Sequence, residues 1–246
     1  MVSQSQAAAR RRRGPRGSAG KTRAAIVEAA RAEFAARGFD GATVDRIAAH
    51  AGVNKAMLYY HFAGKAALYR SLLSEQFTRL AAAHVAARTP DAAPDVRLRT
   101  FIRTIATQIA ADPHFPAMWL REVADGGRHL DAGIAHSMSN IVGELAALLK
   151  QGERAGIFRP AHPFITQMSI VAPLLFFLAS APVRDRLKKQ VAVDVASIPL
   201  DAVVASVEAA VLAGLTVPGS HAVMAPPRDA QVLSSRRSAQ PRRSRA

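Results

Sequence analysis

Apolar residues recur every three to four positions along most of the chain, and no segment alternates between apolar and polar residues as a half-buried strand does. Because this period belongs to the α-helix, the pattern predicts an all-α fold. A first helix is expected over residues 22–37, with Ile26 and Phe34 on its apolar face. Gly38 ends it, since glycine accepts the left-handed conformation of a helix cap, and Phe39 is expected to fold back on Phe34.

Two short helices are expected after the first. Thr43 is placed to cap the second helix, whose inner face carries Ile47 and Ala48. Gly52 stops this helix, and Asn54 provides the cap of the third. Two short helices joined by about three residues that include glycine form a helix-turn-helix, and the small side chain of Ala48 lets the two helices approach closely.

The third helix lies within "VNKAMLYYHFAGK", residues 53–65, and carries a polar and aromatic cluster. Leu58 and Phe62 face the core when residues are placed at about 100° intervals. A helix this short buries one narrow side, so most of its other side chains are expected on the outer face or the flanks: Lys55, Ala56, Met57, Tyr59, Tyr60 and His61. Tyrosine hydroxyls donate to phosphate oxygens, and a small residue lets a helix approach base edges, so the cluster suits the major groove of double-stranded DNA. The alternative is that both tyrosines pack under a neighbouring domain.

The rest of the chain predicts a second, larger helical region. A long helix is expected to begin at Lys65 and to run to Arg88. Prolines and glycines delimit the segments that follow, and helices are expected within these ranges: 101–112, 113–127, 136–156, 163–181 and 199–216.

Residues 163–183 contain no charged side chain, and at 21 residues the run is long enough to span a membrane. Three prolines and several hydroxyl and amide side chains interrupt it, which favours a buried interface helix over a bilayer-spanning one. The helices over 163–181 and 199–216 both carry small residues at helical spacing. Such faces pack closely, so these helices from two chains are expected to form a four-helix bundle and with it a homodimer.

The chain has 246 residues and a formal net charge of +15, much of which lies at its ends. Residues 1–20 hold five arginines and no acid, and residues 219–246 hold six arginines and one aspartate. Segments so rich in arginine and small polar residues bury too little apolar surface to order themselves, so both are predicted to be basic disordered tails. Their natural partner is a polyanion. Simple solubilisation and, for residues 1–16, a transit peptide are the alternatives.

The residues offer little support for an enzyme. There is no glycine-rich phosphate loop and no defensible Ser-His-Asp order, so neither a catalytic residue nor a cofactor is expected. His129 and His136 lie seven positions apart, but Gly133 separates them and a third ligand is missing, which favours hydrogen-bonded or solvent-facing histidines over a metal site. The absence of cysteine and of a signal-peptide segment fits a reducing compartment, here taken as the cytoplasm.

Residues 22–73, "TRAAIVEAARAEFAARGFDGATVDRIAAHAGVNKAMLYYHFAGKAALYRSLL", resemble the DNA-binding domain of the tetracycline-repressor-like (TetR) family. The resemblance implies a helix-turn-helix DNA-binding domain over residues 21–67 and an α-helical ligand-binding and dimerisation domain over residues 68–218. It implies phosphate contacts from five residues: Thr43, Tyr59, Tyr60, His61 and Lys65. It implies base contacts from Lys55, Ala56 and Met57.

The sequence departs from the family's pattern at three places. Gly64 stands where a side chain usually caps the next helix, and Ala66 replaces a common glutamate. Asp45 and Arg46 invert a frequent basic-acidic order, which puts in doubt a base contact from the start of the second helix.

The resemblance also implies a ligand pocket in the second domain. Aromatic, methionine and aliphatic side chains in the middle helices suit an adaptable apolar pocket of this kind: Phe101, Ile105, Phe115, Met118, Trp119, Met138, Met168 and Phe177. Ordinary core packing is the alternative for each of them. Polar groups available to orient a ligand are His114, Arg121, Glu122 and Gln167.

Together these features predict a dimeric DNA-binding transcription regulator, a repressor that binds a palindromic operator and leaves it when a small apolar or amphipathic effector binds. The alternative is an effector-independent architectural nucleic-acid-binding protein in which the basic tails dominate. A protein that ignores sequence binds specific and random duplexes with the same affinity, whereas a repressor binds its specific duplex more tightly than a random one.

Overall fold

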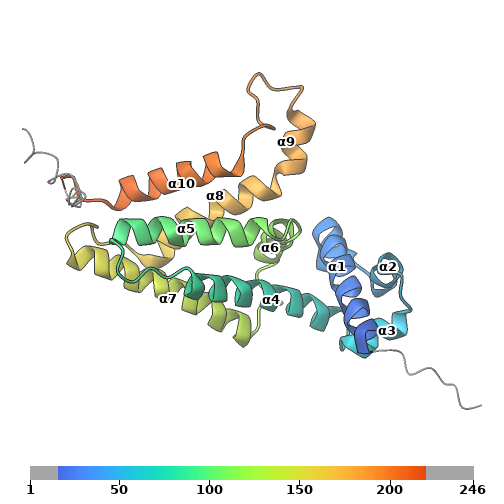
Figure 1. The fold of residues 1–246 in the computed structure, drawn as a ribbon. Coiled ribbons are helices and arrows are strands. Elements are labelled where there is room, and N and C mark those ends of the chain that lie inside the picture. The colour runs from blue at the N-terminus through green and yellow to red at the C-terminus, as the bar shows by residue number, and fades with distance from the viewer. Residues whose placement is uncertain (1–15, 220–246) are drawn as a thin grey trace, which may run out of the picture.

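The computed structural model describes residues 16–219, and within that range the chain forms ten helices and one isolated β-bridge between Phe158 and Thr216 (Figure 1). The all-α prediction is therefore confirmed. The helices are α1 (Arg16–Gly41), α2 (Val44–His50), α3 (Lys55–His61), α4 (Lys65–Ala86), α5 (Pro94–Ala110), α6 (Phe115–Ala124), α7 (Ala132–Arg154), α8 (Pro163–Ala179), α9 (Ala181–Leu187) and α10 (Leu200–Leu215).

Only part of the predicted tails lies in the described range. Helix α1 begins at Arg16, so residues 16–20 of the predicted disordered arm are helical instead. This extra turn extends the helix that the apolar side chains further along α1 stabilise, and the glycine at position 20 does not interrupt it. Residues 1–15 and 220–246, which carry the rest of the two predicted tails, lie outside the described residues.

The local signals around α1, α2 and α3 act as the sequence predicts. Gly38 has φ 71° and interrupts the helical conformation of α1. The rings of Phe34 and Phe39 then stack with their centroids 6.2 Å apart, as expected for a chain that folds back at the cap. Gly52 has φ 64° in the turn after α2, and the side chain of Asn54 accepts the N–H of Ala56 at 2.8 Å to cap α3.

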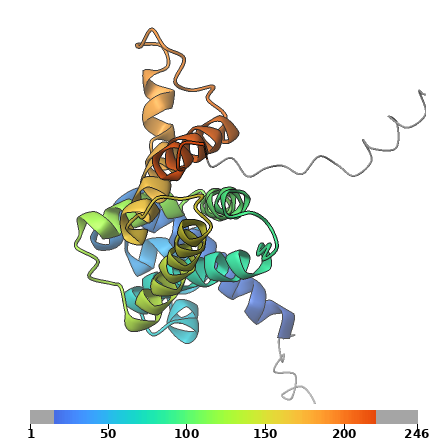
Figure 2. The same cartoon turned by 90° about the vertical axis from the view of Figure 1, so that its left-hand side faces the viewer.

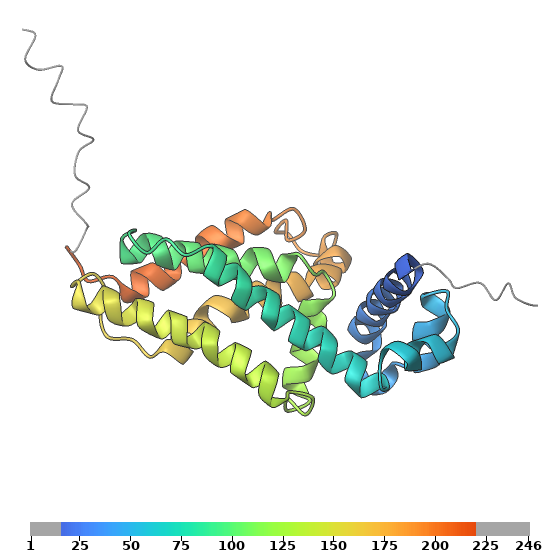
Figure 3. The same ribbon diagram turned by 60° about the horizontal axis from the view of Figure 1, so that its bottom comes forward.

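Helix α4 joins the small three-helix lobe to the larger bundle. It leaves the end of α3 and runs without a break into the bundle beside α5 and α7 (Figures 1 and 3). Leu68 and Tyr69 are buried near its start, and Phe77 and Leu80 are buried further along. The two lobes share one continuous apolar core, so a displacement of α4 in the bundle reaches the lobe that contains α3.

The bundle differs from the prediction in two details. Helix α7 begins at Ala132, four residues before the predicted start, because Asp131 accepts the N–H of Ile134 at 3.0 Å and caps it. The predicted helix over 163–181 is two helices, α8 and α9, that meet at an angle of 53°. Helix α9 buries no side chain and projects from the body of the protein (Figure 2).

The uncharged run of residues 163–183 therefore does not form one long straight helix. Within residues 16–219 no single helix is long and apolar enough to cross a membrane, and only the bent pair α8 and α9 reaches that length and composition together.

Candidate nucleic-acid interface and effector cavity

Helix α3 presents its aromatic residues to solvent. Leu58 is fully buried and anchors the helix, whereas Tyr59 is 52 % exposed and Tyr60 is 76 % exposed. Lys55 and Ala56, at the start of the helix, are also exposed. The alternative in which both tyrosines pack under a neighbouring domain does not hold within residues 16–219, since neither ring is covered there.

Two members of the predicted cluster are less accessible than the rest. Met57 and His61 are half-buried, so Met57 does not face fully outward as predicted. The ring of His61 lies against that of Tyr60, with centroids 5.0 Å apart. The Nε2 atom of His61 is shielded from solvent and has no hydrogen-bond partner among the described residues.

Lys55 reaches back to helix α2. Its Nζ lies 2.8 Å from Oδ1 of Asp45, and this hydrogen-bonded ion pair raises the pKa of Lys55. Both side chains are exposed, so the pair is weak and the ammonium can exchange Asp45 for another acceptor. The pair therefore holds Lys55 at the edge of α3 but leaves its ammonium able to bind a different acceptor.

Lys65 points into the protein instead of toward solvent. Its Nζ donates to the carbonyl oxygens of Phe39 at 2.9 Å and Ala42 at 3.1 Å, and it lies 4.2 Å from the centroid of the Phe39 ring. These contacts tie the start of α4 to the turn between α1 and α2. They argue against the phosphate contact that the resemblance implies for Lys65 and suit a positioning role.

Helix α2 is fixed to α1 by charged groups that the sequence analysis did not identify. Thr43 Oγ1 accepts the N–H of Arg46 at 3.3 Å, which confirms the predicted cap and leaves the exposed hydroxyl free to donate. The Nε atom of Arg46 lies 2.5 Å from Oε1 of the buried Glu33. Arg46 is therefore turned toward α1, an orientation that the sequence analysis did not predict.

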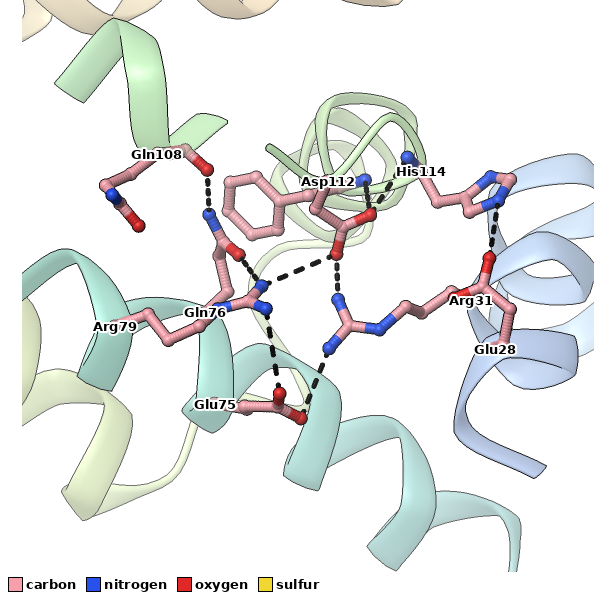
Figure 4. A network of polar contacts seen from close by, with 9 residues as sticks. Glu28, Arg31, Glu75, Gln76, Arg79, Gln108, Asp112 and His114 are labelled. Atoms are coloured by element: carbon pink, nitrogen blue, oxygen red, sulfur yellow. Dashed lines mark hydrogen bonds and ion pairs between the residues drawn. The ribbon is translucent and has the colours of Figure 1, made fainter. Parts of the chain in front are cut away.

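An ion network centred on a buried pair connects the small lobe to the bundle (Figure 4). Arg31 of α1, whose side chain is 7 % exposed, pairs with Asp112 between α5 and α6, and lies 3.2 Å from Glu75 of α4. Burial lowers the pKa of Arg31, and Glu75 opposes that shift. Asp112 also accepts the N–H of His114 at 3.0 Å, so its carboxylate contacts Arg31 of the small lobe and the backbone of the bundle at the same time.

A second junction lies at the other end of α6. Arg121 donates to the carbonyl oxygens of Phe34 and Ala35 in α1. Glu122 accepts from the backbone N–H of His129 at 2.7 Å and lies 2.9 Å from its Nδ1. His129 is thus a buried, hydrogen-bonded histidine, one of the two states that the sequence analysis favoured.

These contacts revise the expected role of three polar residues. His114, Arg121 and Glu122 were expected to orient a ligand, but none of them lines the apolar cavity, and all contribute to contacts at or near the boundary between the lobes. Only the fourth candidate, Gln167, lines the cavity. Sequence periodicity places residues on a helix face but does not indicate which helix will oppose that face.

Helices α4 to α8 enclose an apolar cavity of about 90 Å³. Five of the eight residues predicted to bind a ligand line it: Ile105, Phe115, Trp119, Met138 and Met168. Three do not. Phe101 stacks on His84 with centroids 4.2 Å apart, Phe177 lies under the guanidinium of Arg184 at 3.8 Å, and Met118 is buried elsewhere in the core.

The cavity also has walls that the sequence analysis missed. Phe77 of α4 meets Trp119 edge-on, with ring centroids 5.1 Å apart, and Gln76 lies beside it on the same helix. Gln76 also contacts the ion network: its Nε2 donates to the carbonyl of Gln108 at 2.9 Å, and its Oε1 accepts from Arg79 (Figure 4). No local motif marks Gln76, because its position matters only once α4 and α5 pack together.

The outer faces of α8 and α10 are apolar or small. Ile165 and Phe176 are 65 % and 69 % exposed on α8. The small residues predicted to mediate packing between helices are exposed on α10: Ala202, Ser206, Ala209, Ala213 and Gly214. The two helices pack against each other, and their outer faces have no covering element among residues 16–219.

Comparison with known proteins relates both lobes to one group. Residues 26–72 match the family described as "Bacterial regulatory proteins, tetR family", and residues 94–192 match "Tetracyclin repressor-like, C-terminal domain". The chain is 28 % identical over 180 residues to the HTH-type transcriptional repressor NicS of Pseudomonas putida KT2440, an alignment that covers 72 % of this chain and 84 % of NicS.

Solved structures share the fold. The fatty acid degradation regulator FadR from Bacillus halodurans aligns with a TM-score of 0.60 and 21 % identity, covering 82 % of this chain and 96 % of that protein. FadR from Bacillus subtilis, solved in complex with stearoyl-CoA, aligns with a TM-score of 0.59 and 18 % identity, covering 78 % and 98 %. At these identities the likeness concerns the fold.

Proposed function

The chain belongs to the TetR family of bacterial regulatory proteins, and we propose that it is a homodimeric repressor that leaves a palindromic operator when a small apolar or amphipathic effector binds. The observation that carries the proposal is the pair of exposed tyrosines on α3 next to an exposed Lys55 and Ala56, on a helix held from behind by Leu58. This is the arrangement of a helix that enters a major groove.

The residues of this surface divide by chemistry. Tyr59, Tyr60 and Thr43 carry hydroxyl groups that donate to phosphate oxygens and set the register of the protein on the duplex. Lys55 and Ala56 stand where the start of α3 meets base edges, and Lys55 exchanges Asp45 for a base acceptor. Met57 and His61 support the helix from its flanks, and Lys65 positions α4 instead of binding phosphate.

The exposed apolar faces of α8 and α10 support a homodimer through these two helices. Phe176 of α8 and the small-residue face of α10 are exposed on two helices that pack against each other, which favours close packing against the same faces of a second chain. A two-fold dimer would present two α3 helices to half-sites about 34–36 Å apart. A palindromic operator follows from that symmetry.

The route from effector to DNA runs through α4 and the ion network. Gln76 forms part of the cavity wall and hydrogen-bonds Arg79, which lies 3.8 Å from the Asp112 carboxylate that holds Arg31. An effector that moves this wall changes the position of α4 and of the Arg31 pair together. Since α1 carries Arg31 and packs on α2 and α3, the separation of the two α3 helices in the dimer changes with it. The effector shifts the population only by its differential affinity for the two states.

The proposal is tested by sequencing the fragments that the purified protein retains from a pool of random duplexes. A repressor enriches an inverted repeat whose half-sites are spaced by one helical turn, and variant Lys55→Ala enriches a different half-site. Retention of fragments with no common sequence contradicts the proposal and favours the effector-independent architectural protein.

A further inference from the structure

The wall of the α4–α8 cavity contains no ionisable side chain among the described residues. Its polar groups are the side-chain amides of Gln76 and Gln167, and every other lining residue is aliphatic, aromatic or methionine. Burying a charged group without a partner costs far more than burying a neutral one. The wall therefore discriminates against a carboxylate, an ammonium or a phosphate at this depth.

The two glutamines are in different states. Gln76 has both ends of its amide engaged, with Gln108 and with Arg79. Gln167 is 6 % exposed, and its Oε1 is shielded from solvent with no hydrogen-bond partner in residues 16–219. A buried acceptor without a donor carries the full loss of its hydration, so a molecule that brings a donor to Gln167 relieves that loss.

The size of the cavity limits the molecule further. At about 90 Å³ it is smaller than an engineered apolar cavity of about 150 Å³ that binds benzene, so a single ring requires some widening. Phe164 and Met168, two lining residues of α8, are 55 % and 41 % exposed, so widening the cavity on this side displaces mainly solvent. The rings of Phe77, Phe115 and Trp119 pack against one another and offer aromatic surface to a planar guest.

We infer that the effector cavity takes an uncharged compound of about one aromatic ring that carries a hydrogen-bond donor, and that Oε1 of Gln167 accepts this donor. The inference rests on the proposed function and narrows it. It makes Gln167 the residue that determines specificity, and it separates this cavity from one built for an acyl-CoA, the kind of ligand bound in the Bacillus subtilis FadR complex.

The test uses four probes of similar size on the full chain without DNA. Phenol has a donor, anisole has only an acceptor, toluene has neither, and benzoate is charged. Affinity is measured from the rise of the unfolding temperature with probe concentration, since a ligand that binds only the folded state stabilises it by mass action. Phenol should bind roughly fivefold more tightly than toluene, the ratio expected for one neutral hydrogen bond, and benzoate should bind most weakly.

Variants assign the difference to one side chain. Gln167→Leu and, as a second variant of similar length, Gln167→Met should bind phenol and toluene equally, with toluene binding retained as the control for an intact cavity. Thr166→Val is the matched control, because Thr166 is also buried on α8 but lines the groove toward α10. In that variant the preference for phenol should persist.

The contrary results are distinct. If toluene or anisole matches phenol in the unsubstituted chain, or if the Gln167 variants keep the preference, the inference is wrong while the effector cavity stands. If none of the four probes raises the unfolding temperature, both the inference and the effector cavity fail. Selection of an operator by α3 is measured separately and is unaffected by either result.

Discussion

The outer face of α3 and the cavity between α4 and α8 are both built from helices held by buried aliphatic residues, but they use the remaining side chains in opposite ways. On α3 the aromatic residues are exposed, with Tyr60 at 76 %, and their polar ends are free to contact a partner. In the cavity the aromatic residues pack together, and the amide oxygen of Gln167 has no hydrogen-bond partner in the described part of the chain. The first surface suits a large, highly charged partner that arrives from solvent, and the second suits a small neutral molecule that packs against apolar side chains and donates one hydrogen bond.

The two regions are joined by few polar contacts, and the central pair of these is buried, with the side chains of Arg31 and Asp112 7 % and 5 % exposed. Arg31, Asp112 and Glu75 lie where α1, α4 and the turn before α6 meet (Figure 4). A buried ion pair adds little net stability, but removing one of its partners destabilises the fold strongly because the other charge stays buried without a partner. The comparison therefore predicts that the largest effect of any single substitution will be found between the sites instead of within them.

The first prediction breaks the connection. Arg31→Ala leaves the Asp112 carboxylate buried without its main partner and should lower the free energy of unfolding by about 3–5 kcal/mol, measured by chemical denaturation. The double variant Arg31→Met, Asp112→Asn removes both charges and should recover most of that loss. If effector-induced release of DNA is unchanged in the folded double variant, the network does not couple the sites.

The second prediction concerns acid and the bundle alone. Burial lowers the pKa of His84 from 6.5 to about 4 in the fold, and the nearby Glu144 carboxylate opposes this shift. Between pH 6.5 and pH 4, His84 is therefore protonated in the unfolded chain but neutral in the folded chain. The free energy of unfolding should thus fall as pH decreases through this window, by up to about 3 kcal/mol.

The control separates His84 from other titrating groups. His84→Leu should remove this part of the pH dependence, whereas substitution of the exposed His136 by leucine should leave it in place. Parallel curves for His84→Leu and the unsubstituted chain would show that His84 is not the responsible group.

The contrast between the two regions also explains what the sequence predicts well. The α1–α3 lobe follows from local signals, because Gly38, Thr43, Gly52 and Asn54 fix the helix ends through caps and turns that involve near neighbours in the chain. The same local reasoning placed Tyr59 and Tyr60 on the surface.

Less of the second lobe follows from the sequence, because its features depend on distant contacts. Gln76 reaches a carbonyl 32 positions away, and Arg31 pairs with a residue 81 positions away, so no periodic pattern identifies either. Lys65 illustrates the same limit within the small lobe. Its place at the start of α4 was predicted, but its contacts with Phe39 and Ala42 depend on the fold of the preceding turn.

The third prediction sharpens the division within the DNA surface. Lys55→Ala should change the preferred half-site and cost about 1–3 kcal/mol at the base it contacts. Tyr59→Phe should weaken binding to all duplexes by a similar factor, because a phosphate contact carries no sequence information. Affinities for a panel of single-base operator variants distinguish the two, and a sequence-dependent loss in Tyr59→Phe would show that the roles are assigned wrongly.

The fourth prediction concerns Lys65. Lys65→Met keeps the aliphatic packing but removes two hydrogen bonds to carbonyls, so it should lower the free energy of unfolding by about 1–3 kcal/mol and weaken DNA binding equally for all sequences. The salt dependence of DNA affinity should stay the same, because no phosphate contact is lost. A flatter salt dependence would restore Lys65 to the phosphate-binding set.

The central claim, that α3 reads a specific operator, is tested most directly by titrating the chain with the selected inverted repeat and with a scrambled duplex of the same length while salt is raised. The account predicts an operator affinity at least ~10³-fold higher than that for the scrambled duplex at physiological salt, with the preference persisting as both affinities fall. Equal affinities for the two duplexes at every salt concentration would contradict it.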